Sequence, residues 1–274
     1  MFGTNLLRKV NYISNLVLGF DAFCFNKKFL VFNLVNRNLK IKYRRSFFGF
    51  FWTIIAPLAT SIIYYFVFKI ILKIDRPHYL PFILCGLIPW AFFTQSISEA
   101  TESIVSNQGL ISKIPVPIQV FPLVVSITNF STLLFALPII LVSAWLSGVV
   151  PSLAVFLILP YFLALLLISY ALGAVLAVMY VYLRDLKHAL GLLLQIWFYA
   201  TPIIYDINMI PEKYRFILGL NPVGYIFVGI QESVLGATKN AAFALVGACS
   251  WSLFSLVLLR FTFKRFRGGL PEAL

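Results

Sequence analysis

Between Ile114 and Leu183 the chain contains no aspartate, glutamate, lysine or arginine. A helix needs about 20 mainly apolar residues to cross the hydrocarbon core of a bilayer, so this run is long enough for two or three crossings. Turn-forming residues from Ser147 to Ser152 divide it. Because a lipid-embedded backbone has to form its hydrogen bonds within the chain, the run predicts membrane-spanning helices.

The rest of the sequence has the same character. Of its 274 residues, 61% are hydrophobic and 11% are charged, whereas soluble domains carry about 25% charged residues. Polar and acidic residues interrupt the first apolar stretch, so we expect no cleaved signal peptide. The sequence predicts an all-α polytopic membrane protein with six transmembrane helices at 47–72, 79–98, 118–146, 151–182, 188–205 and 240–260.

The basic residues predict the orientation of these spans. Nine lysines and arginines precede the first predicted span, and four lie at the end of the last span or after it, which are Arg260, Lys264, Arg265 and Arg267. Positively charged flanks stay in the cytoplasm, so both termini are expected there and the number of spans is even. This assignment accounts for the net charge of +13 without a nucleic-acid partner.

If the number of spans is even, the apolar stretch from Phe216 to Gln231 does not cross the membrane. Asn221-Pro222 interrupts this stretch near its start. We expect the segment 206–238 to form an external re-entrant pair of short helices before the last span. The predicted organisation is a cytoplasmic N-terminal region with an amphipathic interface helix (1–46), a transmembrane domain (47–260) and a basic cytoplasmic tail (261–274).

The segment from Phe32 to Arg45 has the pattern of a helix that lies along the membrane surface. On a helical projection its apolar face carries Phe32, Val35, Leu39 and Tyr43, with Leu34 and Ile41 off this stripe, and another face carries Asn33, Arg37, Lys40 and Arg44. A basic anchor that fixes orientation explains the pattern. A more specific hypothesis is that Arg37, Lys40, Tyr43 and Arg44 meet an anionic headgroup such as a lipid diphosphate.

Aromatic residues make up 17% of the chain. Interfacial belts and packing against lipid explain most of them. The alternative is a path lined with flat rings, on which the C–H faces of sugars rest weakly enough for a polymer to slide. The candidate path-lining residues are Phe51, Trp52, Trp90, Phe93, Tyr199 and Tyr205.

Two predicted cytoplasmic connections could contact a partner. In the 99–117 connection, Ile97, Ile104 and Ile111 recur at seven-residue spacing before two prolines, which suits a short docking helix as well as a plain loop. The second connection is the turn 183–188. The candidate coupling residues are Glu99, Glu102, Asn107, Lys113, Arg184 and Asp185.

Several catalytic signatures are missing from the sequence. It has no GxxxxGK[ST] phosphate loop, no nucleophile elbow and no cluster of histidine, cysteine and acidic residues with metal-binding spacing. The predicted spans contain almost no ionisable residues, which disfavours coupling to an ion gradient. We therefore expect no cofactor, metal or catalytic residue in this chain.

Three stretches together resemble one family. They are Asn36 to Ser46 running on to Pro57, Gly86-Leu87-Ile88-Pro89-Trp90 with the following loop to Pro117, and Thr201-Pro202-Ile203-Ile204-Tyr205 with Asn221-Pro222. In this order and spacing they are similar to the ABC-2-type export permeases, and within that family to the polysaccharide exporters for O-antigen, capsule and teichoic acid.

The resemblance implies a transport complex in the bacterial inner membrane. Two copies of the chain would surround a central path, and two separate ATPase subunits would bind ATP and magnesium. The substrate would be a polysaccharide on undecaprenyl diphosphate. By position, Arg37, Lys40, Tyr43 and Arg44 would lie at the cytoplasmic entrance, and the loop from Glu99 to Lys113 and the Arg184-Asp185 turn would contact the ATPase. Asn38, Val116 and Gln231 depart from the family pattern, which often has an acid, an aromatic residue and an arginine there.

Two other functions stay open at this point. One is an ABC-2 exporter of a small lipid or drug. The other is a non-transporting membrane enzyme or scaffold in envelope assembly, for which Glu99, Glu102 and Asp185 are the only acids near the cytoplasmic ends of spans.

Overall fold

The computed structural model describes residues 28–44, 49–113, 116–150, 152–214, 216–236 and 241–266. These residues form helices and short connections, and no β-strand occurs among them. The prediction of an all-α fold is therefore confirmed. Much of the predicted N-terminal region (1–27 and 45–46), the first two residues of the predicted first span (47–48) and the end of the predicted basic tail (267–274) lie outside the described residues.

Among the described residues, four helices are long and apolar enough to cross a membrane. They are α4 (Tyr79–Ser106), α6 (Val120–Leu146), α7 (Ile158–Tyr182) with the preceding 3-10 turn η4 (Leu153–Leu157), and α11 (Ala241–Phe266). The predicted turn between α6 and α7 is confirmed, since Gly148 adopts a left-handed conformation there with φ of 82°. Glycine takes this conformation at little cost because it has no Cβ atom.

Two shorter apolar helices coincide with the remaining predicted spans. The first comprises η2 (Gly49–Phe51), α3 (Trp52–Tyr65) and the π-helical turn η3 (Phe66–Ile71). The second is α8 (Leu186–Ala200), whose 15 residues end before the predicted boundary at residue 205. At 1.5 Å per residue α8 is about 22 Å long, shorter than a typical bilayer core.

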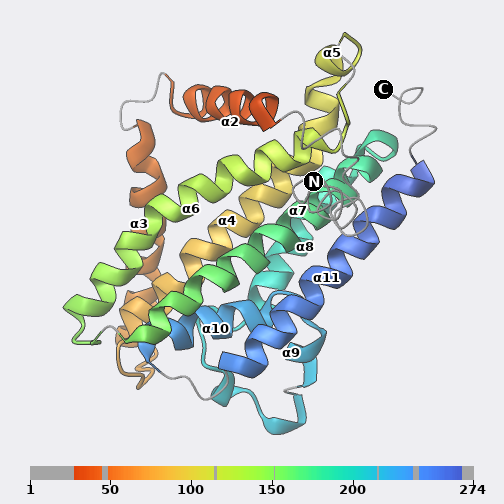
Figure 1. Cartoon of the computed structure of the whole chain (residues 1–274). Helices are drawn as coiled ribbons and strands as arrows, with labels where there is room; N and C mark the ends of the chain where they lie inside the picture. The colour runs from red at the N-terminus through yellow and green to blue at the C-terminus, as the bar shows by residue number, and fades with distance from the viewer. Residues whose placement is uncertain are drawn as a thin grey trace, which may run out of the picture.

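Helix α4 occupies the centre of the bundle (Figure 1) and packs against α3, α6, α7, α8 and α10 (Gly224–Leu235). Small residues let α4 and α7 approach closely. A Cβ atom added at Gly173 would lie 2.7 Å from the Cβ of Ala100, a contact that real side chains do not make. Such small-residue contacts are typical of helix pairs in membranes.

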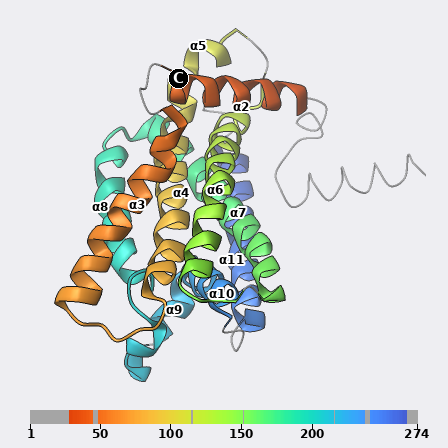
Figure 2. The same cartoon turned by 90° about the vertical axis from the view of Figure 1, so that its left-hand side faces the viewer.

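The two ends of the bundle carry different short elements (Figures 1 and 2). Helices α2 (Lys28–Tyr43) and α5 (Gln108–Ile111) lie at one end, and α9 (Phe216–Leu220) and α10 lie at the other. We call these the α2 end and the α10 end. Two 3-10 turns, η5 (Ile207–Met209) and η6 (Glu212–Tyr214), precede α9.

The segment predicted to lie along the membrane surface forms most of helix α2, which packs across the bundle on α6. Its buried face differs from the apolar face of the sequence pattern. Leu34 and Val35 are each 7% exposed and pack on Val120 and Val124 of α6. Phe32, which was expected on the buried stripe, is 61% exposed. The reason is that α2 rests on protein along one side, so the stripe in contact with α6 includes Leu34 and leaves Phe32 outside.

Helix α4 also extends further than predicted. The second span was expected to end at residue 98, but α4 continues to Ser106. Glu99 and Glu102 therefore belong to the end of a long helix, and the separate short helix of this connection is only α5. This places both acids against neighbouring helices, where they form ion pairs described below.

Candidate functional site

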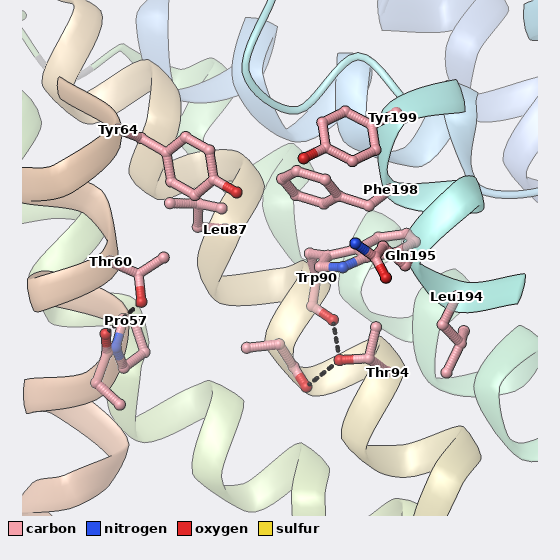
Figure 3. A pocket seen from close by; sticks show the side chains of 12 residues that line it. Pro57, Thr60, Tyr64, Leu87, Trp90, Thr94, Leu194, Gln195, Phe198 and Tyr199 are labelled. Carbon is pink, nitrogen blue, oxygen red and sulfur yellow. Dashed lines mark hydrogen bonds between the residues drawn. The ribbon is translucent and has the colours of Figure 1, made fainter. Parts of the chain in front are cut away.

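The first candidate site is a cavity of about 440 Å³ between α3, α4 and α8, which we call the ring cavity (Figure 3). Tyr64 of α3 points toward Phe198 of α8, and their ring centroids lie 6.0 Å apart. The rings of Trp90 and Tyr199 lie beside Phe198. Three helices far apart in the sequence thus place four aromatic rings around one space.

The rings of this cavity are braced by a second layer of aromatic contacts. The ring centroid of Trp90 lies 5.6 Å from that of Phe198 and 5.3 Å from that of Phe93. Phe93 itself is 0% exposed and meets Trp197 edge to face at 5.2 Å. Of the predicted path-lining residues, Trp90 and Tyr199 line the cavity, whereas Phe93 supports the wall from behind.

Polar groups in the ring cavity are few and come from the same three helices. The hydroxyls of Thr60 and Thr94 donate to carbonyls one turn back in their own helices, at 2.9 Å to Ala56 and 3.0 Å to Trp90. Gln195 of α8 also lines the cavity and is exposed. Flat rings with a few hydrogen-bonding groups form a surface suited to sugars or to other flat or ring-shaped molecules.

A second cavity of about 340 Å³ lies on the other side of α3, bounded by α3, α4, α6 and the end of α2. We call it the lateral cavity. Trp52, one of the predicted path-lining residues, lines it together with Lys42 and Gln95. Ala56 and Pro57 of α3 and Ala91 of α4 line both cavities, so the two cavities adjoin where α3 meets α4.

A polar network joins α2, α4 and α6 beside the lateral cavity. Lys42 Nζ lies 2.5 Å from Asn129 Oδ1 and 3.4 Å from Glu99 Oε1. Asn129 Nδ2 donates to Glu99 Oε2 at 2.8 Å, and Gln95 Nε2 donates to Glu99 Oε1 at 3.0 Å. Asn129 is fully buried, and its amide uses both of its ends in this network.

Several predicted coupling residues gather at the α2 end. Lys187, at the start of α8, forms an ion pair of 2.8 Å with Glu102 of α4, and this hydrogen bond raises the pKa of Lys187. Asn107 donates to the Ser103 carbonyl at 2.8 Å and so closes the end of α4. The remaining three, which are Lys113, Arg184 and Asp185, are exposed.

The predicted entrance residues lie apart from both cavities. Arg37, Lys40 and Arg44 are exposed and are not among the lining residues of either one. Of Tyr43 the structure describes only the backbone, at the end of α2. The predicted ring residue Phe51 is 64% exposed beside the lateral cavity, and Tyr205 donates to the Tyr199 carbonyl at 3.0 Å.

Several residues of these sites were not predicted from the sequence, among them the rings of Tyr64 and Phe198 and the polar residues Lys42, Gln95, Gln195 and Asn129. Lys42 was counted only as one of many basic residues, and Gln195 gave no signal within α8. Asn129 did carry a signal, because it is the only asparagine in the charge-free run from Ile114 to Leu183. Polar residues inside membrane helices are often functional.

At the α10 end, Asn221 holds the non-helical segment after α8 in place. Its Oδ1 accepts hydrogen bonds from Trp197 Nε1 at 2.9 Å and from the Val223 amide at 3.1 Å. Its Nδ2 donates to Thr201 Oγ1 at 2.9 Å and to the Ala200 carbonyl at 3.2 Å. The two sequence motifs at 201–205 and 221–222 therefore meet through one buried side chain.

Other contacts fix the same segment from α4 and α10. Gln231, 5% exposed, donates to the carbonyls of Pro202 and Ile203 at 3.0 and 3.4 Å. A neutral amide can therefore hydrogen-bond to this segment at a position where the family pattern often has an arginine. A Cβ added at Gly86 would lie 2.7 Å from Ile203 Cγ2. The C-terminal end of α8 is thus held against the bundle.

An ion pair also holds the segment after α8 to the connection before α4. Arg76, in the connection before α4, pairs with Asp206, and its guanidinium carbon lies 3.7 Å from the centre of the Phe82 ring. Partial burial lowers the pKa of Arg76.

A helical bundle with apolar helices long enough to cross a membrane and a ring-lined cavity between its helices has the architecture of a membrane transport domain. The model of the ABC-2 type transporter family matches residues 30–235. The chain is therefore a member of the ABC-2 transporter family.

Curated relatives share this similarity over most of their length. The chain is 33% identical over 204 residues to the O-antigen export system permease protein RfbA of Myxococcus xanthus, covering 74% of this chain and 78% of the relative. It is 30% identical over 208 residues to a protein of the same name from Klebsiella pneumoniae, covering 76% and 80%. It is 26% identical over 246 residues to the polysialic acid transport protein KpsM of Escherichia coli, covering 88% and 93%.

Proposed function

We propose that this chain is the transmembrane subunit of an ATP-driven exporter that moves undecaprenyl-diphosphate-linked polysaccharide, such as O-antigen, across the bacterial inner membrane. The observation that carries the proposal is the ring cavity, where Tyr64, Trp90, Phe198 and Tyr199 surround a space within the membrane helices. Aromatic rings bind sugars through their faces, and these contacts depend only weakly on the orientation of the sugar. A polymer can therefore advance from one ring to the next.

The proposal includes a homodimer. The ring cavity lies between α3 and α8, and both helices have exposed apolar side chains, including Ile62 and Ile63 on α3 and Leu192 and Ile196 on α8. A second copy placed against these helices would close the cavity into a path shared by two subunits. Isologous pairing of this kind is the commonest arrangement of homo-oligomers.

The proposal also includes six spans with both termini in the cytoplasm. α3 with η3 and the short α8 would be the two spans beyond the four long helices, and α9 and α10 would form the re-entrant pair. The α2 end would face the cytoplasm, because it carries the cations of α2 and those at the end of α11, such as Lys264 and Arg265.

Two ATPase subunits would bind ATP and magnesium and dock at the α2 end. The exposed α5 and the turn with Arg184 and Asp185 offer a surface there, and the Glu102–Lys187 pair joins this surface to α4 and α8. Movement of a docked ATPase would then reach both walls of the ring cavity through rigid helices.

The proposal is tested by expressing the chain with and without the ATPase subunit encoded nearest to it. We expect the two chains to co-purify, and polymer to reach the cell surface only when both are present and the ATPase is active. Export by this chain alone, or failure to recruit any ATPase, would contradict the proposal.

A second candidate is an ABC-2 exporter of a small lipid or drug. A cavity of about 440 Å³ is in the range that holds a drug-sized ligand. Purified complex separates the two possibilities, since lipid-linked polymer should stimulate ATP hydrolysis if the first is right, and small amphiphiles lacking sugar should do so equally well if the second is right.

A further inference from the structure

The lateral cavity changes from polar to apolar along its length. Helix α4 runs toward the α2 end and α6 runs away from it, so position along each helix orders the lining residues. Gln95 and Thr132 lie nearest the α2 end, whereas Ile88 and Ala136 lie farthest from it. A space with this gradient matches a molecule that has a polar head and a hydrocarbon tail.

The polar part of the cavity contains a cation whose present partner is exchangeable. Charge-assisted N–H···O bonds are usually about 2.7–2.9 Å long, and Lys42 Nζ lies 3.4 Å from Glu99 Oε1. Glu99 already accepts shorter bonds from Gln95 and Asn129. Lys42 also donates to Asn129 Oδ1 at 2.5 Å, but its ammonium has three hydrogens. Lys42 can therefore keep this bond and direct another N–H group to a second anion, while the carboxylate keeps two donors.

The charges around this cavity favour an anionic head. The segment from Lys28 to Arg44 contains five lysines and arginines and no aspartate or glutamate. A cluster of like charges raises the local concentration of oppositely charged ligands. Lys42 is the one cation of this segment that lines the cavity, and its side chain is 22% exposed, so a ligand can reach it.

We propose that the lateral cavity binds an anionic amphiphile, with the Lys42 ammonium holding a phosphate oxygen of the head in place of Glu99 and the apolar part holding the first units of the tail. The inference deepens the proposed function, because the carrier of the exported polymer would be a polyprenyl diphosphate. Pro57, Ile88 and Ala136 line the part of the cavity that would hold the tail.

The binding test uses the full chain in nanodiscs of a zwitterionic phospholipid, with farnesyl diphosphate as the probe. Inorganic pyrophosphate supplies the head alone and farnesol supplies the tail alone. We expect farnesyl diphosphate to bind at least tenfold more tightly than either of them. Equal binding of pyrophosphate would overturn the proposal in favour of a free-phosphate site, and equal binding of farnesol would overturn the role of the cation.

Substitutions on α2 and α4 test the exchange of partners. Lys42→Gln should weaken binding of farnesyl diphosphate at least tenfold, since a charge-assisted hydrogen bond is lost, while Lys42→Arg should retain it. Lys28→Gln is the matched control, because Lys28 is an exposed lysine on the same helix that neither lines the cavity nor belongs to the predicted entrance residues, and its binding should stay within twofold of the wild type.

Glu99→Gln gives the sharpest outcome, because its expected effect on binding affinity is opposite to that of Lys42→Gln. Removing the competing carboxylate should tighten binding several-fold. If Lys42 and Glu99 only held helices together, both substitutions would weaken binding to the same degree, and this result would refute the inference. Export and ATPase recruitment are measured separately in cells. If a variant that no longer binds farnesyl diphosphate in nanodiscs still exports polymer, this site is overturned, but the proposed function is not.

Discussion

Replacing Asn221 with alanine should destabilise the α10 end of the protein. The side chain is 6% exposed and makes the four hydrogen bonds that join α8, the segment after it and the start of α10. Alanine would leave the Trp197 indole N–H and the Val223 amide without an acceptor. Val223 is 0% exposed, so water does not replace its lost partner.

The size of the effect follows from these contacts. Side-chain hydrogen bonds in membrane proteins contribute about 0.6 kcal/mol each, and a buried donor without a partner costs about 1–3 kcal/mol. We therefore expect Asn221→Ala to lower the free energy of unfolding by about 2–4 kcal/mol. For a chain of this size that corresponds to a fall in melting temperature of about 5–10 °C.

The assay is thermal unfolding of the purified chain in detergent, followed by tryptophan fluorescence. Asn38→Ala is the control, because Asn38 on α2 makes one long hydrogen bond, of 3.5 Å from Arg37. It should change the free energy of unfolding by less than about 0.5 kcal/mol. If Asn221→Ala melted within about 2 °C of the wild type, the reasoning from the network would be refuted.

Three further predictions use the same protein. Gly86→Ala should lower the free energy of unfolding by about 1–3 kcal/mol through overpacking, whereas Gly191→Ala, with no atom within 4 Å of its added Cβ, should not destabilise; equal thermal melts would contradict this. Glu102→Ala breaks the exposed Glu102–Lys187 pair and should leave the melting temperature unchanged. The same variant should reduce substrate-stimulated ATP hydrolysis by the assembled complex. Restored hydrolysis in the charge-swapped double variant would support the pairing. Tyr199→Ala should lower surface polymer while Tyr199→Phe preserves it, as quantified by antibody or lectin binding, and equal loss in both would argue against ring stacking.

The sequence is sufficient to predict the helical membrane fold and most helix positions. The charge-free run between Ile114 and Leu183 and its central turn correspond to α6 and α7, because length and apolarity decide whether a segment can cross a bilayer. The end of α4 was predicted too early. Glu99 and Glu102 look like loop residues by charge, but ion pairs with neighbouring helices let the helix continue through them.

The candidate sites were predicted only in part. Trp90 and Tyr199 were named from aromatic content, and the structure places both in one cavity. Phe93, three residues from Trp90, has the same sequence signal but lies behind the wall. Rings on neighbouring turns differ in exposure according to which helices pack beside them, and a single sequence does not contain that information.

Composition, charge and the order of motifs are properties of the chain, and they determined that it is a helical membrane protein and indicated its family. Contacts between distant segments decided the rest. Lys42, Glu99 and Asn129 lie on three helices and have no spacing in the sequence that relates them, yet they form one network. The physical reason is that hydrophobicity acts along a segment, whereas a binding site depends on which helix faces meet, and packing of the whole bundle sets those faces.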